Sequence, residues 1–353
     1  MASTSTLIQL DGSHGEGGGA LVRTALAMAA LTQQAVRIDQ VRAGTNHPGI
    51  DVEDLTLLKA LTKSCAAETI GAEPGSNSVS FLPTRRCAGL KDALDIDPKF
   101  LATRVPNANV LLNALLPVLA RAGAYSHVSL GGETYGSHSL CYDYFANVTM
   151  GAQKRLGLYA FPEQTAAGFG REGGGDVNLE VEPSHLQAIK WAKRGDLVAA
   201  RATIAIGELP MTIAHRGLAH LTNLGINAKL PFEIDIIGVD SRKQGVCVTT
   251  WVEYENGIGG ATAMGAKGIR IEAVAQAAFE DTYEWVRSNA TVDPYLADQI
   301  LPTAIFAEGE TTFTVSRLTK RFLTIVWVIK QFLPIHITVK GTEGEAGEVS
   351  IRR

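Results

Sequence analysis

The stretch DGSHGEGGG, from Asp11 to Gly19, decides how this chain begins to fold. Five of its nine residues are glycine, so the backbone can turn sharply and can approach a bound group closely. The apolar segment Leu7–Leu10 before it predicts a short strand, and the periodic apolar residues of Ala20–Leu31 after it predict a helix. A strand, a glycine turn and a helix therefore open the chain.

Similar orders of helices and strands recur at a spacing of roughly 80–90 residues, which predicts an α+β protein built from internal repeats. The first stretch is expected to continue with a strand at 36–41, a helix at 51–66 whose N-cap is Asp51, and a strand at 78–82. The second and third stretches are expected to contain helices at 109–121, 142–156, 271–288 and 318–332, and strands at 127–131, 176–182, 335–340 and 348–352.

Residues 184–260 follow a different rhythm. Alternating apolar residues predict strands at 198–205, 232–239 and 246–254, with one helix at 211–224. We interpret this segment as a small α/β domain inserted into a larger domain made of residues 1–183 and 261–353.

The composition excludes several classes of protein. The 353 residues are 46% hydrophobic and 19% charged, which excludes disorder for most of the length. No run reaches the roughly 18–20 apolar residues of a membrane helix, so we expect no membrane association. A net charge of −4 means that any contact with nucleic acid needs a local basic patch. The four cysteines form no CxxC pair and the first residues lack a signal-like segment, which favours free thiols in the cytoplasm.

The glycine stretch is the first candidate binding site. A helix that begins after it offers unpaired N–H groups to an anion, Arg23 could add a bidentate phosphate contact, and Glu16 could hold a divalent metal. Two other interpretations stay open: a tight turn with solvent-facing polar groups, or the G-x-G-x-x-A dinucleotide pattern of Gly15–Ala20 with Asp39 about 20 residues on. The dinucleotide interpretation needs a continuing series of parallel strand–helix units.

Three further loops deserve an interpretation. In Arg42–Gly49, Arg42 and His47 could face the same pocket as the glycine stretch or be ordinary surface groups. In Tyr295–Gln299, an aromatic ring, a carboxylate and an amide could bind a purine, or could cap a helix and pack on the core. The glycines of 170–175 precede a strand rather than a helix, which favours a turn.

Together these residues resemble the RNA 3′-terminal phosphate cyclase family. The matching motifs occur in order along nearly the whole chain, the inserted segment included: Leu10-Asp11-Gly12 with Gly15–Gly19 and Arg23, Arg42-Ala43-Gly44 with Pro48-Gly49, Gly131-Gly132, Gly173–Gly175, Tyr295–Gln299, Phe313-Thr314-Val315 and Phe332-Leu333-Pro334. The resemblance implies a large domain of three βαβαββ repeats, with a small α/β domain inserted before the third repeat. It also implies an enzyme that uses ATP and Mg²⁺ or Mn²⁺ to convert an RNA 3′-phosphate into a 2′,3′-cyclic phosphate in RNA end processing. A histidine of the family forms a covalent nucleotidyl intermediate in that reaction.

The resemblance further implies roles for individual residues. Glu16 would lie at the metal and the triphosphate, and Arg23 and Arg42 would clamp phosphates. The partner would be an RNA 3′ end, and a homodimer is left open. The residues that would contact the nucleotide are Asn113, at the place of a glutamine of the family, Tyr295 by stacking on adenine, Leu296 and Ala297 through backbone groups, and Asp298 and Gln299 by hydrogen bonds.

The chain departs from the family's pattern at five places around this predicted pocket. Arg321 stands six residues after Val315, where the family has its histidine, and an arginine stays protonated and cannot attack phosphorus. The other departures are His14 for a glutamine, Asn113 for a glutamine, Thr45-Asn46-His47 for basic residues, and Ser139-Leu140 for a proline.

Three functions therefore stay open. The first is an ATP-dependent cyclase, in which His14 would be the first residue to test as a relocated nucleophile. The second is a non-catalytic relative that binds nucleotide, RNA or a partner of the ribosome-biogenesis type. The third is an enzyme of changed specificity that still binds nucleotide but lacks the covalent step.

Overall fold

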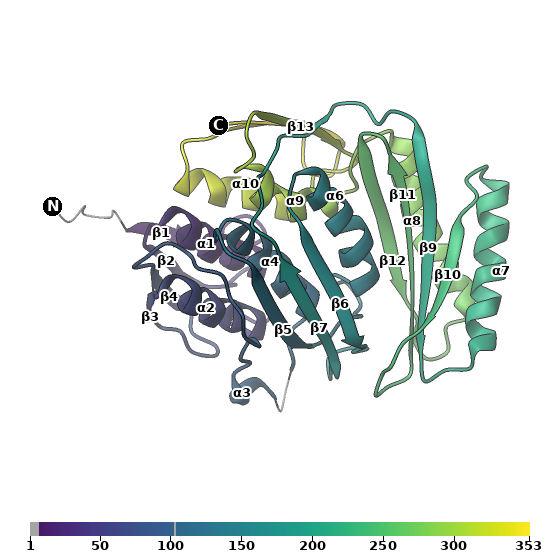
Figure 1. Ribbon diagram of the computed structural model, residues 1–353, viewed down its shortest axis with the longest axis horizontal. Coiled ribbons are helices and arrows are strands. Elements are labelled where there is room, and N and C mark those ends of the chain that lie inside the picture. Colours follow the sequence, from purple (N-terminus) through teal and green to yellow (C-terminus); the bar gives the residue numbers. More distant parts are fainter. Residues whose placement is uncertain (1–6, 102–103) are drawn as a thin grey trace.

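The computed structural model describes residues 7–101 and 104–353, which form a large unit with three sheets and a small unit with one (Figure 1). The large unit occupies the left and centre of Figure 1 and the small unit its right side. The strands of the large unit are β1 (Ile8–Asp11), β2 (Val36–Asp39), β3 (Glu68–Ile70) and β4 (Ser78–Leu82) in the first sheet, β5 (Ser126–Gly132), β6 (Ala160–Ala166) and β7 (Gly175–Val181) in the second, and β8 (Lys190–Trp191), β13 (Glu310–Val315), β14 (His336–Lys340) and β15 (Gly347–Arg352) in the third.

The three sheets of the large unit share one strand order. The first sheet has the order β1-β2-β4-β3 and the third has the order β8-β13-β15-β14, each with a parallel first pair. The second sheet has the order β5-β7-β6, and beside β5 an isolated parallel bridge joins Ala93 to Ser129. The structure thus combines helices with sheets of parallel and antiparallel pairs, consistent with the predicted α+β fold.

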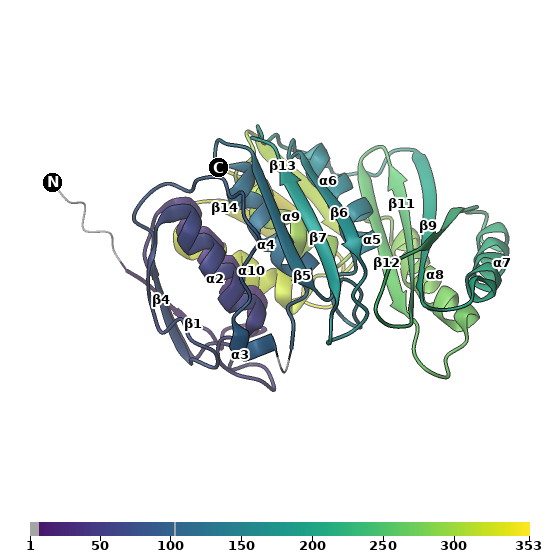
Figure 2. The same cartoon turned by 60° about the horizontal axis from the view of Figure 1, so that its bottom comes forward.

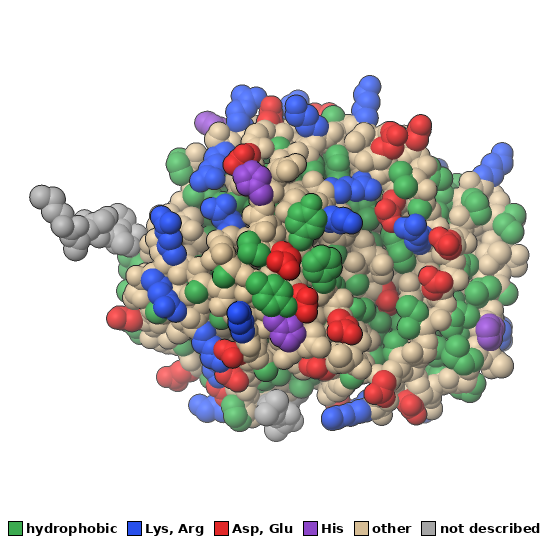
Figure 3. Space-filling view, in the orientation of Figure 1, with side chains coloured by type: hydrophobic (Ala, Val, Ile, Leu, Met, Phe, Trp, Pro, Cys, Tyr) green, Lys and Arg blue, Asp and Glu red, His purple; other side chains and the backbone are tan. Residues whose placement is uncertain are grey.

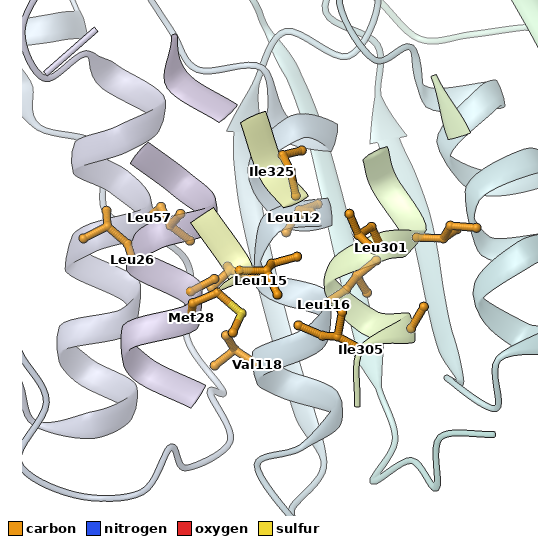
Figure 4. Packing of buried hydrophobic residues seen from close by; sticks show 14 of the residues in the cluster. Leu26, Met28, Leu57, Leu112, Leu115, Leu116, Val118, Leu301, Ile305 and Ile325 are labelled. Atoms are coloured by element: carbon orange, nitrogen blue, oxygen red, sulfur yellow. The ribbon is translucent and has the colours of Figure 1, made fainter. Parts of the chain in front are cut away.

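The helices of the large unit pack on one another between these sheets, and Figure 4 shows their apolar side chains pointing toward a shared interior. Leu26 of α1, Leu115 of α4 and Ile325 of α10 belong to the same buried cluster. Most positions of α1 and α4 are buried, as expected for helices rich in alanine and leucine on every side. These helices are α1 (Gly19–Thr32), α2 (Val52–Cys65), α3 (Pro98–Leu101), α4 (Ala108–Ala120), α5 (Tyr142–Tyr144), the π-helix η1 (Phe145–Thr149), α6 (Met150–Arg155), α9 (Leu296–Ala304) and α10 (Lys320–Phe332).

Capping explains where α2 begins. The Asp51 carboxylate accepts a hydrogen bond from the backbone N–H of Asp54 at 3.2 Å, and the Asp54 side chain accepts one from the Asp51 N–H in return. This reciprocal pair satisfies two of the N–H groups that a helix start leaves unpaired. The predicted N-cap at Asp51 is therefore confirmed.

The small unit is a four-stranded sheet of order β10-β9-β11-β12 with two helices packed on it (Figure 2). The two helices also pack against each other, and Ile271, Val274 and Ala278 of the second one share a buried cluster with the sheet. Its elements are β9 (Leu197–Gly207), α7 (Met211–Asn227), β10 (Glu233–Gly238), β11 (Gly245–Tyr254), β12 (Gly257–Met264) and α8 (Ile271–Ser288).

Both predicted boundaries of the inserted segment, 184 and 260, differ from the structure. Residues 190–191 form β8, which pairs with β13 in the large unit, so the small unit starts later than predicted. The boundary at 260 falls inside β12, and the helix at 271–288 packs in the small unit instead of in the third stretch. Amphipathic periodicity predicted this helix correctly but carries no information about which sheet covers its apolar face.

None of the helices in the described ranges combines the length and hydrophobicity that crossing a membrane requires. On the face shown in Figure 3, basic and acidic side chains are interspersed, in line with the small net charge. Cys65, Cys87, Cys141 and Cys247 are all free thiols, as the sequence predicted.

Candidate functional site

A cavity of about 910 Å³ lies between the helices of the large unit and strand β12 of the small unit. Residues in the first turns of five helices line it: Gly19 of α1, Glu53 of α2, Val110 of α4, Asp298 of α9 and Arg321 of α10. Residues 261–264 of β12 form the wall on the side of the small unit. Each helix start carries a partial positive charge, so the fold concentrates positive potential around this space.

The topology explains why these helix starts converge. Strands β1 and β2 are parallel neighbours, so the helices that follow them, α1 and α2, begin at the same edge of the first sheet. In the third sheet β8 and β13 are also parallel, and α10 directly follows β13, whereas the whole small unit lies between β8 and α9.

The start of α1 differs from the others because no side chain caps it. Asp51, Asn107 and Thr319 each accept a hydrogen bond from a backbone N–H at the start of α2, α4 and α10, and Asp293 does the same for α9. The N-cap of α1 is Gly18, and the first turn contains no acidic residue. The Leu21 N–H donates to the Gly18 carbonyl at 3.2 Å, so the N–H groups of Gly19 and Ala20 are the ones left for an anion from the cavity.

Arg23 and Arg42 lie directly beneath this first turn. A Cβ on Gly19 would come within 2.8 Å of Arg42 Nη1 and closer still to Arg23 Nη1, so a side chain at this position would displace the ends of both arginines. The buried carboxylate of Asp54 fixes both, at 3.1 Å from Arg23 Nη1 and 3.5 Å from Arg42 Nη1, and Arg42 also pairs with Asp51. Burial raises the pKa of Asp54 to about 8, although the two guanidinium groups act in the opposite direction. The structure thus brings both predicted arginines to the glycine stretch.

Five polar atoms of cavity-lining residues are buried without a hydrogen-bond partner among the described residues: Arg42 Nε, Asp51 Oδ2, Glu53 Oε2, Asn113 Oδ1 and Asp298 Oδ1. Of these, Asp51 Oδ2 still forms an ion pair with Arg42. Buried polar groups are normally paired, so unpaired ones lining a cavity indicate a place for a polar ligand. Asn113 was predicted as a nucleotide contact, and it lies on α4 facing this space.

Glu16 is paired with Arg321, the residue at the place of the family's histidine. Arg321 Nε lies 3.2 Å from both carboxylate oxygens of Glu16, and Arg321 Nη2 lies 3.1 Å from Oε1. On the other side of the guanidinium, Asp298 Oδ2 is 3.8 Å from Nε. Burial raises the pKa of Asp298 to about 7, while the charge of Arg321 opposes this shift.

Thr324 holds the two partners together. Its hydroxyl accepts a hydrogen bond from the Glu16 N–H at 2.9 Å and donates one to the Lys320 carbonyl at 2.8 Å. Since Thr324 follows Arg321 by about one helical turn, both side chains contact the glycine loop from the same face of α10.

The predicted divalent metal does not fit these residues. Both oxygens of Glu16 accept hydrogen bonds from a guanidinium, and the described residues contain no cluster of three or more histidine, cysteine or acidic side chains suited to a metal ion. A positive charge about 4 Å from this guanidinium is repelled by about 1 kcal/mol per unit of charge in water, and by about 4 kcal/mol near a protein surface. A dication at Glu16 would have to displace Arg321 and would still lie beside it.

The segment Tyr295–Gln299 is only partly as predicted. Tyr295 is half-exposed and lines the cavity with Asp298 and Gln299. Leu296 and Ala297 are fully buried outside its lining, and the Leu296 N–H already donates to Asp293 at 3.0 Å. The amide of Gln299 accepts from the Thr149 hydroxyl at 2.5 Å and donates to the Tyr295 carbonyl at 3.0 Å.

Of the two histidine interpretations, the surface one fits His47, which is exposed. His14 is exposed and stacks on Trp327 with ring centroids 3.8 Å apart, and neither it nor His47 is among the cavity-lining residues. His138 does line the cavity, on a loop where it adopts the left-handed φ of 60°. The sequence pattern offered no signal for it, because it belongs to no motif and only the fold brings its loop to the pocket.

Other lining residues were also absent from the prediction. Arg104 Nη2 donates to Glu53 Oε1 at 2.9 Å, and Asn107 Nδ2 donates to Glu133 Oε2 at 3.1 Å. Asn107 could have been found as a cap before an apolar run, whereas the pairing of Arg104 with α2 could not.

The dinucleotide interpretation of the glycine stretch is wrong. Strand β2 pairs antiparallel with β4, so the parallel series that this interpretation needs stops after β2. Asp39 pairs with Arg37 at 2.9 Å and accepts from Ser78 at 2.7 Å, and it does not line the cavity. The expected turn at the second glycine cluster is present, with Gly170, Gly173 and Gly174 at positive φ before β7.

Comparisons with known proteins agree on one family. The family model described as RNA 3′-terminal phosphate cyclase matches residues 14–339. Similar proteins named RNA 3′-terminal phosphate cyclase come from Methylococcus capsulatus, 33% identical over 98% of this chain and 96% of the relative, and from Methanopyrus kandleri, 32% identical over 98% and 99%. A third, from Pyrococcus furiosus, is 33% identical over 98% of this chain and 99% of its own.

Among solved structures, the enolpyruvyl transferase NikO from Streptomyces tendae aligns at 12% identity with a TM-score of 0.40. The alignment covers 98% of this chain but 48% of that one, so this chain spans about half of its length, and the likeness carries no functional argument. The family match and the three relatives extend over almost the whole sequence. The chain therefore belongs to the RNA 3′-terminal phosphate cyclase family.

Proposed function

We propose that the cavity binds the triphosphate of ATP at the start of α1 and also accepts the 3′-phosphate of an RNA end. The uncapped first turn of α1 and the guanidinium groups of Arg23 and Arg42 supply the phosphate contacts. The half-exposed ring of Tyr295 offers a stacking surface for the base, and Asn113 and Asp298 offer polar atoms that lack partners among the described residues. The observation that carries this proposal is the set of unpaired polar atoms around a cavity that also receives an uncapped helix start.

The second part of the proposal is that the bound ATP does not become attached to α10. In the reaction that the family resemblance implies, a histidine attacks the α-phosphate of ATP and displaces pyrophosphate. AMP then moves from the histidine to the RNA 3′-phosphate, and the neighbouring 2′-hydroxyl attacks that phosphate and displaces AMP. Arg321 cannot be the nucleophile because its guanidinium stays protonated and both its Nε and Nη2 donate to Glu16. The protein then acts as a nucleotide- and RNA-end-binding member of the family without the family's covalent step.

A second candidate is a cyclase whose nucleophile has moved, and one observation favours it. His138 lines the same cavity and holds a backbone conformation that is unusual outside glycine, of the kind found at functional sites. In this case the covalent nucleotide would be found on the loop before α5 instead of on α10.

We further infer that the large unit consists of three copies of one βαβαββ unit, the second of which keeps only a bridge in place of its first strand. The shared strand order supports this. The small unit would then be an insertion within the third copy, between β8 and α9.

Calorimetric titration with ATP tests the first part, once with excess Mg²⁺ and once with a chelator. We expect binding in at least one condition, weakened by about tenfold or more in Arg42→Ala and unchanged in the matched control Arg37→Ala, whose guanidinium pairs with Asp39 outside the cavity. A binding free energy weaker than about −4 kcal/mol, which corresponds to a Kd above about 1 mM, in both conditions would overturn the proposal.

Two further measurements test the RNA end and the covalent step. A short RNA with a 3′-phosphate should bind more tightly than the same RNA with a 3′-hydroxyl, because only the phosphate can use the arginines. Incubation with α-phosphate-labelled ATP should leave the protein unlabelled. A label that maps to His138, or to His14, would establish the relocated-nucleophile function in place of the one proposed.

A further inference from the structure

We infer that Arg321 supplies the positive charge that a divalent metal would otherwise supply, so that this site binds a polyphosphate without metal. Before the ligand arrives Glu16 is the counter-ion of Arg321, and a phosphate of the ligand then takes the place of Glu16. The inference rests on the proposed function of the same cavity, and its tests are chosen to separate the two.

The first step is the geometry of the pair. Arg321 donates through Nε and Nη2 to Glu16, an arrangement that both aligns the guanidinium and leaves Nη1 without a hydrogen-bond partner among the described residues. The Arg321 side chain is 50% exposed and that of Glu16 is 30% exposed, and both line the cavity. A phosphate in the cavity can therefore reach the guanidinium and compete with the carboxylate for its donors, since guanidinium binds phosphate and carboxylate with the same bidentate geometry.

The second step is that the pair is built into the fold. Thr324 binds the backbone N–H of Glu16 at 2.9 Å, so the glycine loop of the first sheet is attached to α10 one turn beyond Arg321. Gly15 adopts φ +61° at this point and a Cβ there would collide with the Thr324 hydroxyl, so the loop approaches the helix as closely as the backbone allows. The carboxylate is held next to an arginine even before a ligand binds.

The third step concerns the charges around the guanidinium. Asp298 lies 3.8 Å from Arg321 Nε, with its side chain only 7% exposed. The carboxyl groups of Asp298 and Glu16 thus lie on either side of a permanent cation, the Arg321 guanidinium. A metal ion bound between these carboxyl groups would be repelled by that guanidinium. An arginine is always charged, so this positive charge is present whatever the metal concentration or the pH.

The decisive experiment compares ATP affinities of the full chain with Mg²⁺ and with a chelator in the wild type and in two variants. In the wild type we expect the two affinities to agree within about threefold. Arg321→Ala should bind about tenfold to hundredfold more weakly in chelator, because charge-assisted hydrogen bonds are lost. Glu16→Gln should bind about threefold to tenfold more tightly in chelator, because the competitor for Arg321 is neutral. If Glu16 were a metal ligand, this second variant would instead bind more weakly than the wild type in Mg²⁺.

Two control variants and one independent probe complete the design. Lys330→Ala removes an exposed cation from the other end of α10, and Glu343→Gln neutralises an exposed acid outside the cavity; both should bind ATP as the wild type does. Titration with Mn²⁺ alone, followed by electron paramagnetic resonance, should show no bound metal in the wild type at micromolar concentrations. This probe uses no nucleotide and so does not depend on the proposed function.

The outcomes are distinguishable. ATP binding that requires Mg²⁺, or that weakens in Glu16→Gln, overturns the role of Arg321 and leaves nucleotide binding intact. Tight binding of Mn²⁺ that disappears in Glu16→Gln overturns it as well. Absence of ATP binding in every condition overturns the proposed function, and with it this inference.

Discussion

Replacing Thr324 by valine tests the connection between the glycine loop and α10. The Thr324 hydroxyl is almost completely buried, with the residue 2% exposed, and it makes two hydrogen bonds, one from the Glu16 N–H and one to the Lys320 carbonyl. Valine keeps the β-branched shape and the volume, so the helix and its packing should persist. The change therefore removes the acceptor for one backbone N–H without creating a cavity.

The magnitude follows from that single lost acceptor. A hydrogen bond contributes about 0.5–1.5 kcal/mol, and leaving a buried partner unsatisfied costs about 1–3 kcal/mol. Water can partly replace the hydroxyl because the Glu16 side chain is 30% exposed. We therefore expect Thr324→Val to lower the free energy of unfolding by about 1–2 kcal/mol.

Urea unfolding followed by circular dichroism measures this loss. The matched control is Thr62→Val on α2, where the hydroxyl also donates to the carbonyl four residues earlier but accepts from no loop. It should change stability by less than about 0.5 kcal/mol. A double-mutant cycle between Glu16→Gln and Arg321→Ala measures the coupling free energy of the ion pair. It should be about 0.2–1 kcal/mol in the wild-type background and smaller when Thr324→Val is also present. Equal losses in the two valine variants, or an unchanged coupling, would refute the idea that Thr324 positions the ion pair.

Three other outcomes are expected. The free energy of unfolding should fall between about pH 4 and pH 7 through Asp298, because burial raises its pKa to about 7 and the native state keeps a proton that the unfolded state releases near 3.8. This contribution amounts to up to about 1.4 kcal/mol per pH unit. Urea titrations at several pH values should show it in the wild type and not in Asp298→Asn. Arg321→His should form a slow, acid-labile adenylate with labelled ATP, since a neutral imidazole returns beside the phosphate-binding arginines, and no label after prolonged incubation would contradict the assignment of that position. Gly19→Ala should weaken ATP binding by about tenfold or more in calorimetry, because a Cβ there forces Arg23 and Arg42 out of place, and unchanged affinity would show that the first turn of α1 is not the phosphate site.

Local signals explain which parts of the fold could be predicted. The cap at Asp51 and the periodic helix at 271–288 were found because each depends on residues a few positions apart. The membership of that helix in the small unit was missed, since its apolar face matches any sheet of suitable shape and only the contacts with β11 and β12 decide. The short strand β8 was missed for a related reason: two residues carry no periodicity, and its strand character comes from pairing with β13.

The site divides in the same way. Glu16, Arg23 and Arg42 could be proposed from one glycine-rich loop and its neighbours, because they lie within one strand–helix unit and the next. The pairing of Glu16 with Arg321 spans 305 positions, and nothing in either segment indicates that a carboxylate intended for a metal would face a guanidinium. His138 was missed because its loop has no sequence pattern of its own. The motif that predicts a backbone contact of Leu296 with the nucleotide does not show that the Leu296 N–H already donates to Asp293.

The convergence of helix starts gives these separate observations a common cause. The parallel pairs in the first and third sheets direct the starts of α1, α2 and α10 toward one cavity, which the start of α9 also lines, so the helix dipoles concentrate positive potential there before any side chain is chosen. Side chains cap three of these four starts, which leaves α1 as the one that a ligand can cap. A substitution at position 321 therefore alters the chemistry without removing the potential that attracts phosphate. In the proposed function, nucleotide binding without the covalent step is therefore consistent with the fold, because the potential comes from the backbone and the covalent step from a single side chain.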